Sequence, residues 1–153
     1  MKFGQAIDSV LFKNYFNLEG KATRSEYWWF MLFFIIFNLF AGIVVGIVAG
    51  ITLGADFNPD TFSLYYTLGL LALFILPLLG LSVRRFADAG RGKREAIVVF
   101  VLATISQLIV PMGGAQGAII PVAEFLIMPA WIVLGATGLY TLYIALKKSI
   151  QIN

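Results

Sequence analysis

Four long runs of apolar residues are separated by short polar segments along the chain. They cover residues 27–50, 64–83, 96–112 and 121–146. An α-helix rises about 1.5 Å per residue, so runs of roughly 17 to 26 residues match a hydrocarbon core about 30 Å thick. The pattern therefore predicts an all-α membrane protein with four transmembrane helices, in a single membrane domain of residues 1–153.

Local signals add detail to the first two of these helices. Thr23 and Glu26 have the spacing of a capping box, in which both side chains satisfy backbone N–H groups at a helix start. The aromatic residues 27–30 follow at once, and such rings belong at the boundary between water and lipid. Pro77 lies inside the second run and predicts a kink there, because proline removes one backbone donor.

The amino-terminal segment, residues 1–22, has polar residues among its apolar ones and is not expected to be a signal peptide. Phe3, Ile7, Val10 and Leu11 recur at helical spacing, which predicts a short amphipathic helix. Two placements of its apolar stripe stay open. The stripe lies in the headgroup region of the bilayer, or it packs on the protein's own cytoplasmic loops.

Three glycines lie four residues apart in the first apolar run, at Gly42, Gly46 and Gly50. Glycines at this spacing share one stripe of a helix and let a second helix approach closely. Glycine is also common in membrane helices as background. The spacing favours a packing face, and the partner belongs either to the same chain or to another copy.

Composition excludes an ordinary soluble domain. Hydrophobic residues make up 60% of the chain and charged residues 12%, against about 25% charged in soluble domains. The sequence has no cysteine and no histidine, which removes thiol chemistry, the commonest general base and the commonest metal ligand. We therefore expect no enzymatic activity, no metal site and no cofactor.

Positive charge is distributed asymmetrically along the chain. All eleven Lys and Arg residues lie before residue 27, within residues 84–95 or at the carboxyl-terminal end, and the other two connections have none. Because Lys and Arg accumulate in cytoplasmic loops, four crossings with both termini in the cytoplasm are predicted, with residues 84–95 as a basic cytoplasmic loop. The basic residues that give the net charge of +3 lie next to the predicted membrane helices, so this charge does not indicate a nucleic-acid partner and none is expected.

Two of the polar segments resemble the signatures of a known family. Residues 20–30 read G-K-A-T-R-S-E-Y-W-W-F, and residues 84–91 read R-R-F-A-D-A-G-R. They are similar to the motifs G-R-A-S-R-S-E-Y-W-W-F and R-R-L-H-D-x-G-x-S-G-W of domain-of-unknown-function family 805. The resemblance covers roughly residues 12–110. It implies a small multi-helix protein of the bacterial inner membrane and supplies no settled activity.

The second motif departs from the family pattern at four positions. Ala87 stands where the family has His, and Gly92, Lys93 and Arg94 replace Ser, Gly and Trp. The missing histidine puts in doubt any role that family members assign to it.

Charged residues of the two motifs are expected to meet at the cytoplasmic surface. A carboxylate buried there needs a cationic partner. The expected pairs are Glu26 with Arg84 or Arg85, and Asp88 with Arg24 or Arg91. Basic residues outnumber the acids, so either a charged clamp fixes the helix ends or the cations bind anionic lipid headgroups. The candidate anion-binding residues are Arg24, Arg84, Arg85, Arg91, Lys93 and Arg94.

Three polar residues inside the apolar runs are candidates for transport. Glu124 is the acidic residue within the fourth run, and an intramembrane carboxylate is a candidate proton or cation site. It also fits the first turn of that helix near the outer surface, where the helix dipole favours a carboxylate. Asn38 and Gln107 would line a solute path or form hydrogen bonds between helices.

Three functions follow, and the first is favoured. It is an oligomeric scaffold or accessory subunit that acts through the basic loop, with anionic membrane lipids, further copies of the chain or another membrane protein as partners. The alternative is a small ion or solute channel or transporter that uses Glu124, Asn38 and Gln107. A membrane enzyme would have to use Glu26 or Asp88 as its base.

Overall fold

The structure, a computed structural model, describes residues 1–114 and 122–148, without the side chains of residues 60, 111–114 and 122–124. Regular structure in the described residues is helical throughout, which confirms the predicted all-α class for this part of the chain. The elements are α1 (Phe3–Asp8), the π-helical η1 (Ser9–Lys13), α2 (Arg24–Leu53), the 3-10 helix η2 (Gly54–Asp56), α3 (Pro59–Asp88), α4 (Lys93–Gly114) and α5 (Val122–Leu146).

Among the described residues, three helical segments are long and apolar enough to cross a membrane. They are Arg24–Asp56, Thr61–Asp88 and Phe125–Leu146. The first two contain the predicted spans 27–50 and 64–83, and the third covers most of 121–146. The predicted span 96–112 lies within α4, and its crossing stays a prediction.

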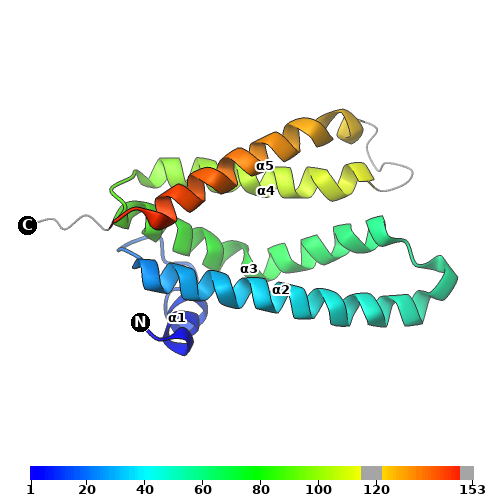
Figure 1. Cartoon of the computed structure of the whole chain (residues 1–153), viewed down its shortest axis with the longest axis horizontal. Coiled ribbons are helices and arrows are strands. Elements are labelled where there is room, and N and C mark those ends of the chain that lie inside the picture. The colour runs from blue at the N-terminus through cyan, green and yellow to red at the C-terminus, as the bar shows by residue number, and fades with distance from the viewer. Residues whose placement is uncertain (115–121, 149–153) are drawn as a thin grey trace, which may run out of the picture.

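The long helices form two pairs. α2 and α3 make one antiparallel hairpin, and α4 lies alongside α5 as the second pair (Figure 1). The pairs meet where the last part of α3 packs on α4, and they diverge toward η2. α3 changes direction within its length, and Pro77 lies inside this helix. Proline removes a helical hydrogen bond and its ring clashes with the preceding turn, which accounts for the predicted kink and for the divergence.

The predicted basic loop, residues 84–95, is corrected by the structure because most of it is helical. α3 continues to Asp88 and α4 begins at Lys93, so the connection comprises residues 89–92 alone. Val83 and Phe86 are buried in one apolar cluster with Ile144 of α5. Burial of these apolar side chains at helical spacing stabilises the last turns of α3 despite their charged residues.

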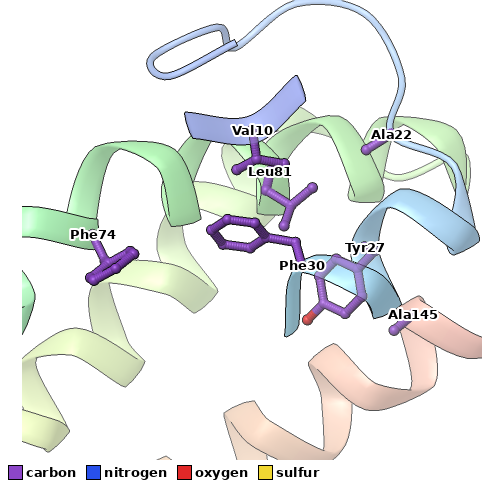
Figure 2. Close-up of a cluster of buried hydrophobic side chains, with 7 residues drawn as sticks. All are labelled: Val10, Ala22, Tyr27, Phe30, Phe74, Leu81 and Ala145. Carbon is purple, nitrogen blue, oxygen red and sulfur yellow. The ribbon is translucent and has the colours of Figure 1, made fainter. Parts of the chain in front are cut away.

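The amino-terminal segment packs on the protein. Val10 of η1 is fully buried in a cluster with Tyr27 and Phe30 of α2 and Leu81 of α3, and Figure 2 shows these side chains. Leu11 packs against the same cluster. These two residues thus pack on helices α2 and α3, and not on cytoplasmic loops as one of the two predicted placements had it.

Close approach to α3 is possible because position 80 is a glycine. A Cβ atom added at Gly80 would lie 3.1 Å from the backbone oxygen of Asn17 and 3.6 Å from that of Asn14. The segment after η1 therefore lies directly on the surface of α3.

The glycine stripe of α2 faces α3 of the same chain. A Cβ at Gly42 would lie 3.3 Å from the Tyr66 hydroxyl oxygen, and one at Gly46 would lie 3.7 Å from the Phe62 ring. A Cβ at Gly50 would meet open space. The partner of the packing face is thus intramolecular for the first two glycines.

Candidate functional site

Two segments far apart in the sequence meet at the end of the bundle that holds α1 and the α3–α4 turn. The backbone N–H of Ala22 donates to the carbonyl oxygen of Arg84 at 3.1 Å. Nη1 of Arg84 donates to Oε1 of Glu26 at 2.9 Å, and the two residues are only 3% and 4% exposed. Arg84 is one of the two partners predicted for Glu26. The contact joins residues 20–30 to residues 84–91.

The start of α2 positions Glu26. Oγ1 of Thr23 accepts a hydrogen bond from the Glu26 N–H at 3.2 Å, which is one half of the predicted capping box. The other half is corrected, because the Glu26 carboxylate turns to the Ser9 hydroxyl at 2.9 Å and to Arg84. A buried carboxylate is stabilised more by a cation and a hydroxyl than by one backbone N–H at a helix end.

Arginines from α2 and α3 satisfy the carbonyl groups at the end of α5. Nη2 of Arg85 donates to the backbone oxygens of Ile144 at 3.0 Å and Ala145 at 3.1 Å, and also to that of Lys147. Nε of Arg24 donates to the Lys147 oxygen at 2.9 Å. The last carbonyls of a helix have no partner within it, and the helix dipole favours cations there. α2 and α3 thereby hold the end of α5.

Asp88 forms a buried ion pair with Arg85, one turn earlier on α3. The partners predicted for Asp88 were Arg24 and Arg91. Arg85 lies three residues away on the same helix face, and both side chains are withdrawn from solvent, so the local pair limits the charge buried at the end of α3. We refer to Arg24, Glu26, Arg84, Arg85 and Asp88 together as the arginine clamp.

The α3–α4 turn begins with a Schellman motif. The N–H of Arg91 donates to the carbonyl of Phe86 at 2.8 Å, and the N–H of Gly90 donates to that of Ala87 at 3.1 Å. Gly90 has a φ of 75°, the left-handed conformation that this cap requires and that glycine adopts without strain. The turn directs the chain from the buried clamp to the exposed start of α4.

The remaining candidate cations, Arg91, Lys93 and Arg94, are exposed, and we call them the basic triad. Nη1 of Arg91 lies 3.7 Å from Oε1 of Glu95, a half-exposed contact with little electrostatic strength. The six candidate anion-binding residues thus divide into three that serve the clamp and three that face outward.

The transport candidates lie elsewhere. Asn38 and Gln107 both line a cavity of about 660 Å³ between α2 and α3 on one side and α4 and α5 on the other. Asn38 accepts from the Tyr66 hydroxyl through its backbone oxygen at 2.7 Å and its side-chain oxygen at 3.1 Å. The predicted role of Glu124 falls on a side chain outside the described ones.

Several participants were not predicted from the sequence. Ser9 binds Glu26, and the Tyr140 hydroxyl donates to Glu95. Glu95 has a sequence signal, because it lies four residues after Arg91 on a helix start. Ser9, Tyr140 and the backbone carbonyls of α5 have none, since their contacts depend on tertiary structure.

One comparison with known proteins gives a match. A family model described as "Protein of unknown function (DUF805)" matches residues 15–148. No curated protein and no solved structure matches the chain.

Proposed function

The chain belongs to the protein family of unknown function DUF805, and we propose that it is a multi-pass membrane protein acting as a non-enzymatic scaffold or accessory subunit. In this proposal α4 crosses the membrane together with α2, α3 and α5, and both termini face the cytoplasm of a bacterium. The basic triad binds anionic lipid headgroups of the inner membrane, while the arginine clamp keeps the helix ends that carry the triad in place.

The observation that carries the proposal is that the basic residues gather at one end of the bundle, where some form the arginine clamp and others are exposed. All eleven Lys and Arg residues belong to residues 2–24, 84–94 or 147–148. These three segments lie together at the end opposite η2 (Figure 1), where Ala22, Arg84, Arg85 and Lys147 are in contact. Cations mark the cytoplasmic side of a membrane protein, and the exposed basic triad is open to contact with lipid phosphates.

The length and position of α4 support a fourth crossing. The helix has 22 residues, and a rise of about 1.5 Å per residue makes it about 33 Å long, enough for the hydrocarbon core. α4 packs along α5, which is itself long and apolar enough to cross. Its charged residues Lys93, Arg94 and Glu95 lie in the first turn, at the cationic end.

Lipid binding is tested with the full chain in nanodiscs of neutral lipid that contain a minor fraction of phosphatidylglycerol. Each cation near an anionic surface contributes about 1 kcal/mol, so neutralising Arg91, Lys93 and Arg94 to Gln should weaken phosphatidylglycerol retention roughly hundredfold at low salt. Raising ionic strength should shrink the difference, because the triad is exposed. Lys13→Gln is the control, since Lys13 already pairs with Asp8 at 2.6 Å. Equal retention by the triple variant and the control would refute headgroup binding.

The non-enzymatic part of the proposal rests on the state of the carboxylates. Glu26 and Asp88, the two residues expected to serve as a base, are each held in a buried ion pair with an arginine. Both side chains are withdrawn from solvent, so a substrate has no open approach to either carboxylate.

The scaffold role is tested by measuring the intact mass of the particle extracted in a mild detergent. A defined oligomer, or a second membrane protein that co-purifies at fixed stoichiometry, supports the role. A particle that remains strictly monomeric at all protein concentrations contradicts it.

A second candidate function is passage of a solute, which is favoured by the position of Asn38 and Gln107 on one cavity. Proton and cation flux into liposomes is measured for the unchanged protein and for Glu124→Gln. Flux that depends on Glu124, with assembly unchanged, supports transport, and equal flux for both proteins removes it.

A further inference from the structure

The cavity lies between the two helix pairs, and each pair forms one of its walls. Phe34, Asn38 and Tyr66 lie on the side of α2 and α3, and Thr104, Gln107 and Thr137 lie on the side of α4 and α5. α2, α3 and α5 each contain a segment apolar and long enough to cross a membrane. The inference rests on the proposed membrane crossing, in which these helices face hydrocarbon and a molecule dissolved in the bilayer reaches the cavity between them.

None of the described residues that line the cavity is charged. They are mainly Leu, Ile, Val, Ala, Met and aromatic residues, with Ser, Thr, Asn and Gln among them. An ionised group placed against such walls would lose its hydration without gaining a counter-charge, which costs several kilocalories per mole or more. The lining therefore selects an uncharged occupant.

The size of the cavity is typical of a site for a small molecule. Its volume of about 660 Å³ lies within the range of about 300–1,000 Å³ that is usual for such sites.

Two carboxamide groups give the cavity hydrogen-bonding capacity. The side-chain oxygen of Asn38 accepts from Tyr66, which leaves the amide NH2 group of Asn38 as a donor. The Gln107 side chain has no hydrogen-bond partner among the described residues. In a water-poor site these donors gain most from carbonyl oxygens of a ligand, because an unpaired amide in apolar surroundings is unfavourable.

From these observations we propose that the cavity is a binding site for an uncharged lipid that carries ester or ketone carbonyl groups. The hydrocarbon part contacts the apolar walls, and the carbonyl oxygens accept hydrogen bonds from the amides of Asn38 and Gln107. The site is separate from the basic triad and does not depend on headgroup binding there.

Photolabelling of the full chain in phosphatidylcholine nanodiscs tests the proposal. The probe is a diacylglycerol with a diazirine on one acyl chain, and the comparison probe is the phosphatidic acid with the same chains. Labels mapped by peptide mass spectrometry should concentrate on cavity-lining residues of α2, α3, α4 and α5. Phosphatidic acid should label them roughly tenfold less, since its phosphate cannot enter an uncharged site.

Filling the cavity provides a matched pair of variants on α5. Gly138 lines the cavity whereas Gly135 does not, and a Cβ at either position meets open space. Gly138→Leu should reduce diacylglycerol labelling of the cavity about tenfold, and Gly135→Leu should leave it unchanged. Thermal unfolding in detergent verifies that both variants are folded.

Removal of a donor tests the hydrogen-bonding part. Gln107→Leu preserves the apolar character of the wall and should lower diacylglycerol labelling several-fold, while labelling by a diazirine alkane that lacks carbonyl groups does not fall. Three outcomes would each overturn the proposal: equal labelling by diacylglycerol and phosphatidic acid, labels spread over the outer helix faces, or loss of labelling in Gly135→Leu to the same extent as in Gly138→Leu. If Gly138→Leu fails to fold, Ala103→Phe on α4, in the same wall, takes its place.

Discussion

The guanidinium of Arg84 and the carboxylate of Glu26 lie 2.9 Å apart and are both withdrawn from solvent, although 58 positions separate them in the sequence. The pair connects the start of α2 with the end of α3. It therefore fixes the hairpin at the end where the cations gather. Removing one partner leaves an uncompensated buried charge, whereas removing both does not.

This asymmetry gives the first prediction. Glu26→Gln should lower the free energy of unfolding by about 3 to 5 kcal/mol, and Arg84→Met by a similar amount. The double variant Glu26→Gln with Arg84→Met should lose less than the sum of the two. Chemical unfolding in detergent micelles, followed by tryptophan fluorescence, measures the three values.

The exposed pair between Lys13 and Asp8 is the control for that cycle, because its loss should change stability by at most about 1 kcal/mol. Additive effects of the two buried substitutions would show that Glu26 and Arg84 do not act as a pair.

The second prediction concerns the turn between α3 and α4. Gly90→Ala forces an L-residue into the left-handed conformation and should destabilise the protein by about 1 to 2 kcal/mol. Gly92→Ala, two residues later, has open space and no positive φ, so it should be neutral within about 0.5 kcal/mol. The midpoints of thermal unfolding of the two variants measure this difference in stability. Equal midpoints would contradict the role given to Gly90.

The third prediction concerns the contact of the amino-terminal segment with α3. Gly80→Ala places a methyl group 3.1 Å from the Asn17 carbonyl oxygen, so the segment must move away. We expect limited proteolysis between residues 13 and 23 to become faster by several-fold, because local opening becomes easier. Gly69→Ala on the same helix meets open space and should leave the cleavage rate unchanged.

The fourth prediction concerns the end of α5. Arg85→Gln removes the charged donor shared by Ile144, Ala145 and Lys147, and a hydrogen bond to a charged group contributes about 1.5 to 3 kcal/mol. Amide hydrogen exchange in the last two turns of α5 should accelerate by roughly tenfold or more. Exchange in the first turns of α2 serves as the reference, and uniform acceleration in both regions would indicate global unfolding instead.

The presence of long apolar helices could be predicted from hydropathy, because a run of apolar residues has few alternatives to a helix in hydrocarbon. The limits of the helices could not. Arg84, Arg85 and Asp88 have the composition of a loop, yet they continue α3 because their charges are neutralised by Glu26, by one another and by carbonyls of α5. Such neutralisation is a tertiary effect that local sequence does not encode.

The residues of the candidate site could be predicted from the sequence, but the ion pairs that they form could be predicted only in part. Glu26 has a predicted partner, whereas Asp88 pairs with Arg85, which was not named for it. The cavity was not predictable at all, since its volume depends on how far the helix pairs diverge between Pro77 and the η2 end of the bundle. Asn38 and Gln107 were recognisable as polar residues in apolar runs, but only the packing shows that they line the same cavity from its two walls.

The bonds from Arg85 to the end of α5 also set an order of events during biosynthesis. The carbonyl of Ile144 is translated 59 residues after Arg85, so this arginine emerges from the ribosome long before its acceptors exist. Until α5 has been synthesised, the guanidinium of Arg85 has Asp88 as its ion-pair partner and lacks its three carbonyl acceptors. The contacts that hold the end of α5 are therefore among the last of the bundle to form.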